Sequence, residues 1–548
     1  MLTWCRLRVL LQYRAPLQTR FYATDTDVYP RITVPQRMLQ KLAKHNVRKA
    51  KEEAMKKRLR LKTLVISSKR KEYQFYKGQK FDVFDPKQLA SHGWKHRNCS
   101  YDHFTLVCHK ANPAVPSEDG AEVNFEQFDL DERILQFLHS EGIEKPTNIQ
   151  SMVIPQLLAG KHIVCAAETG SGKTYAYLLP IVHNIIRQKK AGLLSDKTKN
   201  SPHSVIVVPS IELASQIMGV CENIAQTVPI KPFLVDRRRK TQAVLREDGG
   251  QVMDVLISTP GVLTRLLNTN YIQVSKMTCL VLDEADTLLD DSFCSLTRRI
   301  LRKLQVGKSS AIGETYMNEG VQVSLVSATF PKGLEESVGD VLPIDSFEQL
   351  TTRHLHQLMP HVPQKFIKMK SADKFATLLS ILKKKTNMMS MIFCNKQNAC
   401  MWLSKSLEEM GIDNVCVVGY LDEEKRYSQL KSFLEGETNV LVCTDIASRG
   451  IDTKMVDHVI NFDFPNHVSD YIHRVGRVGR VGAKNTGQVT NFIVNPWDVD
   501  LVWKIEISAR RQMELTNVDA NIKRKVNRIQ PTKKGLELQE TKIDDSPV

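Results

Sequence analysis

Residues His162 to Thr174 read HIVCAAETGSGKT, in which a short apolar run passes directly into small residues and ends in Lys-Thr. An apolar run of this length is typical of a strand buried in a parallel sheet. The part that begins at Ala167 is the pattern of a phosphate-cradling loop, because small residues let backbone N–H groups face an anion and a helix N-terminus follows. Lys173 is expected to reach the β and γ phosphates, and Thr174 to offer its hydroxyl to Mg²⁺. The stretch therefore predicts a nucleotide-binding domain.

A second apolar run, Cys279 to Leu282, ends in Asp-Glu-Ala-Asp. A carboxylate at the carboxyl end of a strand beside the phosphate loop can hold Mg²⁺, and its neighbour can orient or deprotonate an attacking water. Asp283 is therefore an expected metal ligand together with Thr174, and Glu284 is the expected catalytic carboxylate, supported by Lys173. The loop residues expected to bind the nucleotide are Ala167, Glu168, Thr169, Gly170, Ser171, Gly172, Lys173 and Thr174.

Short apolar runs alternate with helical patterns along two stretches of the chain, which predicts an α/β fold with two tandem parallel-sheet domains. With 548 residues the chain is too long for one ordinary domain. The expected strands are His162 to Ala166, Ser204 to Val208, Val255 to Ser258, Leu280 to Leu282 and Val323 to Val326, then Met391 to Cys394, Asn414 to Val418, Val440 to Cys443, His458 to Asn461 and Gln488 to Val494. Residues 344 to 360 lack strong periodicity and are expected to form the hinge.

The expected organisation is a presequence (1–24), a basic N-terminal extension (25–120), two domains (121–345 and 346–516) and a basic flexible tail (517–548). The chain holds 77 Lys and Arg against 60 Asp and Glu, a net charge of +17, which favours a polyanionic partner. Nucleic acid is the first candidate and an anionic membrane surface the second. No apolar stretch of about 18 residues occurs, so no membrane span is expected. The eleven cysteines include no CxxC pair, which argues against a zinc ribbon or a disulfide framework and fits a reducing compartment.

The first 24 residues carry arginines and no acidic residue, with Trp4, Leu7, Leu10 and Leu11 at helical spacing. This pattern favours an amphipathic mitochondrial presequence. The alternative is a basic tail that binds RNA or directs nuclear import. A helix is expected from Val34 to Leu61, and the region up to residue 120 is either an RNA-docking extension or a solvated charged segment. The arginines of the presequence are Arg6, Arg8, Arg14 and Arg20.

Asp-Glu-Ala-Asp at residues 283 to 286 is the signature of DEAD-box ATP-dependent RNA helicases, and the chain resembles that family from residue 125 to about residue 510. The resemblance implies two RecA-like domains, an ATP hydrolase that uses Mg²⁺, and RNA-stimulated hydrolysis coupled to local unwinding. The segment Gly142 to Gln150 resembles the Q motif, in which Gln150 would read the adenine edge and Phe125 would lie against the base.

The second domain carries two further motifs of that family. The segment that begins at Thr444 resembles motif V, where Thr444 would meet an RNA phosphate, Asp452 the ribose of ATP, and Arg449 would couple the two sites. The segment His473 to Arg480 resembles motif VI, in which Arg477 and Arg480 are the expected arginine fingers, because a guanidinium can stabilise charge on a transferring phosphoryl group.

Two RNA-facing motifs depart from the family pattern, since Ile211 and Val262 each stand where the family has an arginine. The basic run Asp236 to Lys240 either replaces the lost charges or is a solvated loop. The residues expected to contact RNA or to couple RNA binding to hydrolysis are Pro209, Ser210, Thr259, Pro260, Gly261, Ser327, Thr329, Thr444, Arg449 and Arg474.

The segments Asp463 to Pro465 and Asn495 to Val499 resemble a vertebrate mitochondrial branch of the family that is linked to RNA granules and to the large mitoribosomal subunit. This resemblance implies ribosomal RNA and large-subunit assembly intermediates as partners, in the matrix at RNA granules or nucleoids. The alternative location is the nucleus or nucleolus. Two other functions remain open: an RNA-dependent ATPase that acts as an assembly clamp with little unwinding, and a DNA translocase of a related helicase group.

Overall fold

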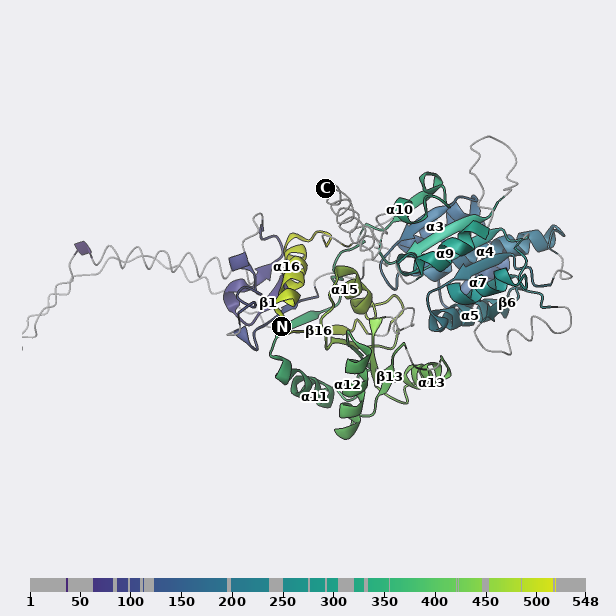
Figure 1. Cartoon of the computed structure of the whole chain (residues 1–548). Helices are drawn as coiled ribbons and strands as arrows, with labels where there is room; N and C mark the ends of the chain where they lie inside the picture. Colours follow the sequence, from purple (N-terminus) through teal and green to yellow (C-terminus); the bar gives the residue numbers. More distant parts are fainter. Residues whose placement is uncertain are drawn as a thin grey trace, which may run out of the picture. The chain divides into compact units, whose positions relative to one another are not determined.

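The helices and strands named below belong to one unit of the computed structural model, Lys62–Val548 (Figure 1). Among the described residues, no helix is both long enough and apolar enough to cross a membrane. The expected presequence lies outside the described residues, as do the expected helix 34–61 apart from residues 36–37 and the expected tail apart from Val518. The structure describes residues 36–37, 63–81, 86–96, 99–108, 112, 123–194, 199–235, 250–274, 276–290, 293–303, 320–329, 334–353, 355–419, 421, 423–445, 453–483, 485–515 and 518.

The first domain is built on a seven-stranded sheet with the order β10-β4-β9-β8-β5-β7-β6, and every pairing in it is parallel. Parallel strands need crossover connections, which are mainly helices here. The strands are β4 (Ile163–Ala166), β5 (Ser204–Val207), β6 (Pro232–Val235), β7 (Val255–Ser258), β8 (Cys279–Asp283), β9 (Gln322–Ser327) and β10 (Glu348–Thr351). The α-helices are α2 (Glu132–Ser140), α3 (Asn148–Leu158), α4 (Lys173–Lys190), α5 (Ile211–Ala225), α7 (Pro260–Asn268), α8 (Ala285–Leu288), α9 (Cys294–Lys303) and α10 (Leu334–Val338).

Helices cover both faces of this sheet, and successive residues of β8 show why its strands are apolar throughout. Val281 packs into the core beneath α2 to α5, whereas Leu280 and Leu282 pack into the opposite core beneath α7 and α9. Side chains alternate between the two faces of a strand, so a sheet buried on both faces needs an apolar residue at each position. Polar side chains are thereby left to the carboxyl ends of the strands, where the loops begin.

The second domain contains a nine-stranded sheet with the order β13-β14-β12-β15-β16-β11-β3-β1-β2. The six strands from β13 to β11 pair in parallel, and the last three are antiparallel additions. The parallel strands are β11 (Gln364–Lys368), β12 (Ser390–Phe393), β13 (Val415–Val417), β14 (Val440–Cys443), β15 (His458–Asn461) and β16 (Gln488–Ile493). The α-helices are α11 (Lys374–Lys384), α12 (Gln397–Glu409), α13 (Glu423–Leu434), α15 (Val468–Val475) and α16 (Pro496–Arg511).

The three antiparallel strands come from the N-terminal region: β1 (Leu64–Ser68), β2 (Phe75–Tyr76) and β3 (His103–Leu106). We call residues 63–108 the N-terminal lobe. Strand β3 pairs with β11, and the ring of Phe104 stacks on that of Phe366 with centroids 4.8 Å apart. The lobe therefore covers an otherwise open edge of the second domain's sheet, which removes a row of unpaired backbone groups.

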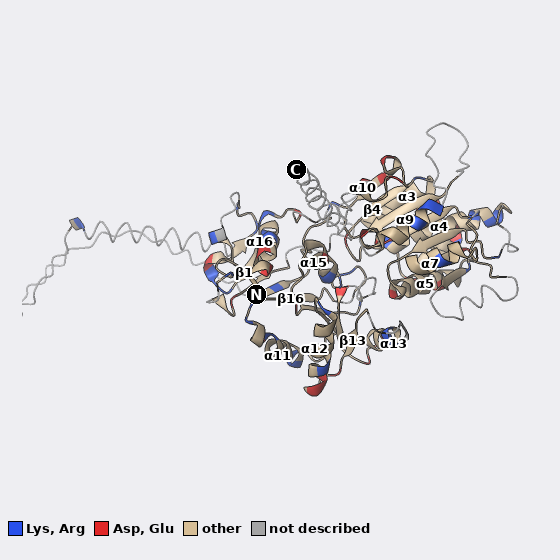
Figure 2. Cartoon of the chain, viewed as in Figure 1, with Lys and Arg blue, Asp and Glu red and all other residues tan. Residues whose placement is uncertain are grey.

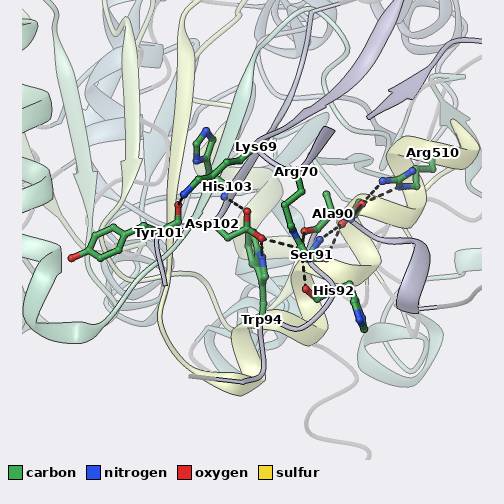
Figure 3. Close-up of polar contacts among 11 residues, drawn as sticks. Lys69, Arg70, Ala90, Ser91, His92, Trp94, Tyr101, Asp102, His103 and Arg510 are labelled. Carbon is green, nitrogen blue, oxygen red and sulfur yellow. Dashed lines mark hydrogen bonds and ion pairs between the residues drawn. The ribbon is translucent and has the colours of Figure 1, made fainter. Parts of the chain in front are cut away.

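Buried polar contacts also tie the lobe together and to helix α16 (Figure 3). Asp102 accepts a hydrogen bond from the indole N–H of Trp94 at 2.8 Å and pairs with Arg70 at 2.9 Å. Glu506 of α16 accepts hydrogen bonds from the backbone of Ala90 and Ser91 and pairs with Arg510. Because Glu506 and Trp94 are both fully buried, each polar group needs the partner it has.

The predicted fold class, two tandem parallel-sheet α/β domains, is confirmed, but the domain limits differ in two places. Strand β10 pairs with β4, so the first sheet continues past residue 345 into the segment that we expected to be the hinge. The N-terminal lobe, expected as part of a separate basic extension, belongs to the sheet of the second domain. Both differences involve strands at the edge of a sheet.

Candidate functional site

The phosphate loop lies between β4 and α4, with the glycine Gly172 as the N-cap of the helix. A side chain at Gly172, where φ is +91°, would place its Cβ 2.7 Å from Nε2 of Gln150, so only glycine fits. The Lys173 ammonium donates to the carbonyls of Ala167 at 2.7 Å and Glu168 at 2.8 Å. Burial lowers the pKa of Lys173, whereas nearby acidic groups favour its charged form. The Lys173 ammonium therefore lies against the backbone of the phosphate loop.

The two carboxylates that follow β8 have different environments. Asp283 accepts a hydrogen bond from the Tyr177 hydroxyl at 2.9 Å, and burial together with the charge of Glu284 raises the pKa of Asp283 to about 6. Glu284 has φ of +53°, a left-handed conformation that is unusual for a residue other than glycine. Its Oε2 atom is buried and has no hydrogen-bond partner among the described residues. Strain and an unpaired oxygen at one residue indicate a functional position.

The residues of the expected Q motif lie beside the phosphate loop. Gln150 accepts from the backbone N–H of Thr147 at 2.9 Å and donates to the carbonyl of Gly172 at 3.1 Å, so its amide is connected to the loop. Phe125 is 2% exposed and packs edge to face with Phe128 inside the first core. Its ring therefore presents little surface to a base in this structure, and its contact with adenine stays a prediction.

A buried polar chain connects the Asp-Glu-Ala-Asp segment to motif VI. Oδ2 of Asp286 accepts a hydrogen bond from the Thr329 hydroxyl at 2.7 Å and lies 3.2 Å from Nε2 of His473. The backbone N–H of Thr329 in turn donates to Ser327 Oγ at 3.2 Å. Asp286 and His473 had no role in the sequence-derived site, although both stand inside its motifs. Their contact gives the expected coupling residues Ser327 and Thr329 a physical link to the second domain.

Arg474, which we expected at the RNA-facing or coupling positions, is 1% exposed, and all five of its N–H groups are used inside the second domain. Two of them donate to the carboxylate of Asp445, at 2.6 and 2.7 Å. The others donate to the side chains of Asn395 and Asn461 and to the carbonyl of Asp463. This arginine joins motifs V and VI to Asn395, which follows β12, and it has no donor left for a phosphate.

The two expected arginine fingers lie next to this network. Arg477 is 3% exposed, and its Nε donates to the carbonyl of His473 at 3.2 Å. Nε of Arg480 donates to the carbonyl of Gly476 at 3.2 Å. The backbone N–H of Val481 donates to the carbonyl of Gly170, so the residue that follows motif VI contacts the phosphate loop. The structure thus brings together the loop, the carboxylates and the arginines that the sequence predicted as one site.

The expected RNA-facing residues of the first domain lie at helix N-termini. Ser210 is the N-cap of α5 and accepts from the backbone of Leu213 at 3.3 Å, while Thr259 and Pro260 begin α7. Ile211 is partly exposed. Val262, by contrast, is 3% exposed and packs in the core with Leu263, so it does not face a ligand. The valine that replaces the family's arginine at residue 262 therefore fills space in the core, in addition to lacking the positive charge.

The positions of the other predicted residues follow from the same elements. Pro209 and Thr169 are partly exposed in the loops after β5 and β4, and Gly261 is partly exposed in the first turn of α7. Ser171 is buried, and its Oγ has no hydrogen-bond partner among the described residues. Thr444 is 8% exposed at the end of β14. Arg449, Asp452 and the basic run from Asp236 to Lys240 lie outside the described residues.

No group of three or more His, Cys, Asp or Glu side chains with metal-binding geometry occurs in the part of the chain that the structure describes. A Mg²⁺ site does not require such a group, because Mg²⁺ is usually held by one or two carboxylates together with phosphate oxygens and water. The donor set of Thr174 and Asp283, with the adjacent Glu284, one oxygen of which has no hydrogen-bond partner in the described part of the chain, fits a nucleotide with its metal ion.

Comparison with known proteins agrees with this geometry. The family model of DEAD/DEAH box helicases matches residues 147–337, and that of the helicase conserved C-terminal domain matches residues 373–482. The chain is 38% identical to the mouse (Mus musculus) protein named probable ATP-dependent RNA helicase DDX28, over 84% of this chain and 86% of the relative. It is 36% identical to the human (Homo sapiens) protein of the same name over the same shares.

Two solved structures have the same fold. S. cerevisiae Dbp5 bound to RNA and ADP BeF3 aligns with a TM-score of 0.59 and 24% identity, covering 74% of this chain and 98% of Dbp5. Mss116p bound to ssRNA and AMP-PNP aligns with a TM-score of 0.58 and 22% identity, covering 73% of this chain and 80% of Mss116p. At these identities the likeness shows the fold alone, while the family models and the closer relatives show the family. The chain belongs to the DEAD-box family of ATP-dependent RNA helicases.

Proposed function

We propose that this helicase acts in mitochondria, where it couples ATP hydrolysis to local remodelling of ribosomal RNA during assembly of the large mitoribosomal subunit. The single observation that carries the hydrolytic part is Glu284. Its carboxylate has a buried oxygen that no described residue contacts by a hydrogen bond, and it follows Asp283 at the carboxyl end of β8. An acceptor without a partner at this place is suited to hold and deprotonate a water molecule.

In this proposal each side chain around the phosphate loop has its own role. Lys173 and the backbone N–H groups that follow Ala167 bind the phosphates, and Gln150 selects adenine. Thr174 and Asp283 hold Mg²⁺, which when bound neutralises charge on the phosphates. Arg477 and Arg480 stabilise the charge that develops during transfer of the phosphoryl group. In the second domain, Thr444 binds an RNA phosphate, Asp452 the ribose and Arg449 couples both sites.

Coupling in this proposal runs through the chain of Thr329, Asp286 and His473. Since the hydroxyl of Thr329 and the ring of His473 share one oxygen of Asp286, a shift of either domain changes the contacts beside Glu284. RNA and ATP would then favour the same arrangement of the domains, and each would promote binding of the other. Contacts to phosphates carry no base information, so sequence preference is expected to be low.

The test of the hydrolytic site is Glu284→Gln, which keeps the shape of the side chain and removes its basicity. We expect RNA and ATP to bind as in the wild type, while RNA-stimulated turnover falls by roughly a hundredfold or more. Glu222→Gln, a change of the same kind on the exposed side of α5, is the matched control. Wild-type turnover in Glu284→Gln would remove the assignment.

The mitochondrial part rests on the acid-free arginine pattern of residues 1–24. Residues 1–30 fused to a fluorescent protein should reach mitochondria, and reversing the charge of Arg6 and Arg14 should prevent this. A nuclear or diffuse signal from the intact fusion would contradict the location. Crosslinking the full protein to RNA in isolated mitochondria, followed by sequencing, tests the RNA target: enrichment of large-subunit ribosomal RNA is the expected result.

A second candidate function is an assembly clamp that binds RNA in an ATP-dependent way with little unwinding. The observation that favours it is the first domain's RNA-facing region, where a buried Val262 and an apolar Ile211 replace two arginines. A strand-displacement assay distinguishes the two functions, since a clamp would hydrolyse ATP and bind RNA but release few strands.

A further inference from the structure

The carbonyl of Gly479 lies between the two arginine fingers and accepts two side-chain hydrogen bonds. Nε2 of His361 is 2.9 Å from this oxygen, and Nδ2 of Asn112 donates to it at 3.1 Å. The carbonyl oxygen belongs to the planar peptide that joins Gly479 to Arg480. Two donors on that oxygen therefore fix the orientation of the peptide plane, and with it the direction in which the chain enters Arg480.

The two donors come from different connections between the domains. Asn112 lies after β3, on the segment that leads from the N-terminal lobe into the first domain. His361 lies between β10 and β11, on the segment that leads from the first domain back into the second. Each of these two connections thus contributes one side-chain donor to the carbonyl of Gly479.

The packing around Gly479 shows that this arrangement leaves little freedom. Gly479 has φ of +69°, and a Cβ atom there would lie 2.4 Å from Cγ2 of Val362 and 2.6 Å from Nε2 of His361. His361 is 4% exposed, and burial lowers its pKa, so its ring is neutral near pH 7. Because a carbonyl only accepts, the single ring proton must be on Nε2.

The rest of the motif VI loop is fixed in a similar way. The carbonyl of Arg477 accepts from the Thr453 hydroxyl at 2.6 Å, and that of Arg480 accepts from the backbone N–H of Ala483 at 3.1 Å. Ala483 follows the loop closely in the sequence, and Thr453 lies within the second domain, between β14 and β15. Asn112 and His361 differ from them because they belong to the segments that join the two domains.

We propose that Asn112 and His361 are positioning residues that orient the Arg477–Arg480 loop, and that through them both connections between the domains act on the arginine fingers. The inference rests on the proposed role of these arginines at the γ-phosphate. A change in the path of either connection would move a donor away from Gly479 and loosen the peptide before Arg480. Hydrolysis would then slow without a loss of nucleotide or RNA binding, because the arginines act mainly on the transition state.

The test uses substitutions that remove a donor while keeping size. Asn112→Asp replaces the N–H donor with an acceptor of equal shape, His361→Leu removes the donor, and His361→Gln retains one. We expect RNA-stimulated kcat of the full-length protein to fall about three- to tenfold in Asn112→Asp and in His361→Leu, the scale of one hydrogen bond. The KM for ATP and the Kd for single-stranded RNA should change less than about twofold. His361→Gln should recover most of the lost kcat.

Ser404→Ala is the control for a loss of stability alone, since it removes the partly buried hydrogen bond from the Ser404 hydroxyl to Asn414 in the same domain. If Ser404→Ala lowers kcat as much as Asn112→Asp at an equal loss of thermal stability, the positioning role is wrong. Unchanged kcat in Asn112→Asp also overturns it, and this variant is informative even if His361→Leu does not fold, because Asn112 is partly exposed. A wild-type protein without RNA-stimulated hydrolysis would instead overturn the proposed function.

Discussion

Arg474 and Asp445 form a two-bond ion pair in which the arginine is buried, with Nε 2.6 Å from Oδ1 and an Nη atom 2.7 Å from Oδ2. The guanidinium is planar and offers parallel donors, so this pairing fixes the direction of both side chains. The pair joins the end of β14 to helix α15, from which the arginine fingers follow. The sequence suggests that Arg474 faces RNA, but in the structure this residue connects two elements of the second domain.

The first prediction concerns the contacts of Arg474. Arg474→Lys keeps the positive charge but cannot replace five fixed donors, so Asn395, Asn461 and Asp445 would lose partners in a buried site. The free energy of unfolding should fall by about 2 to 4 kcal/mol, measured by urea denaturation. Arg511→Lys, on an exposed residue of α16, is the matched control and should change stability little. Equal stability of the two variants would contradict the role given to Arg474.

The fold could be predicted where strands are buried on both faces. The runs around β4, β5, β7, β8 and β9 are apolar at nearly every position, and their observed limits differ from the expected ones by about one residue. Strand β10 was missed because only Leu350 of its four residues is buried. Strands β1 to β3 were missed because partly exposed residues interrupt their buried ones, and because nothing local in a short antiparallel strand tells which sheet it will join.

The site could be predicted as far as its motifs are local in the sequence. Lys173, Asp283 and Glu284 lie where a phosphate loop and a strand end should place them. The partners of Arg474 and the contact of Asp286 with His473 depend on how distant segments meet, and spacing alone does not carry that information. Asn112 is the clearest case, since it stands in a connection with no motif.

The second prediction separates two departures from the family pattern. Ile211 is partly exposed at the start of α5, so Ile211→Arg should add about one phosphate contact and steepen the slope of log affinity against log salt by roughly 0.7 for single-stranded RNA. Val262→Arg must instead bury a guanidinium in the core beneath α7, and it should lower the melting temperature without steepening the slope. Titrations of a fluorescent RNA at several salt concentrations measure both. A steeper slope in Val262→Arg would show that this side chain reaches the RNA.

The third prediction is a loss of stability in mild acid. Burial lowers the pKa of His203 to about 4 and that of His458 to about 3, whereas an unfolded histidine titrates near its usual value of about 6.5. Below that value the unfolded chain binds more protons than the folded one, so stability falls as the pH drops from 7 to 5 and is present in full above about pH 6.5. Each histidine should account for about 2 kcal/mol of this loss at pH 5.

Urea denaturation at pH 7 and pH 5 tests this assignment. His203→Gln and His458→Gln remove the titrating group but keep a polar side chain beside Thr278 and Thr490, respectively. Each variant should lose less stability than the wild type between the two pH values. The same pH dependence in the double variant as in the wild type would show that other groups cause the loss.

The last prediction concerns the outer face of the N-terminal lobe, opposite the core that holds Phe104. On this face Thr105 lies between Ser67 of β1 and Lys365 of β11, and His103 follows beside Lys69. Burial is the largest cause that lowers the pKa of His103, and the charges of Lys365 and Lys69 lower it further. Positive charges therefore gather on this face. Hydroxyls and lysines on an open sheet face suit the phosphates of RNA. Figure 2 marks the Lys and Arg residues of the lobe in blue.

Deleting the lobe would not test this surface, because strand β3 completes the sheet of the second domain and its loss would expose the edge of β11. Lys69→Gln combined with Lys365→Gln leaves the strands intact and removes two charges. We expect the slope of log affinity against log salt to flatten by roughly 1.4, at about 0.7 per phosphate contact, with unchanged kcat at saturating RNA. The matched control is Lys276→Gln combined with Lys405→Gln, two exposed lysines on the first domain and on α12, near the opposite edge of the second sheet. An equal flattening in both double variants would mean that only the net charge of the protein matters, and no change in either would leave the lobe with a purely structural role.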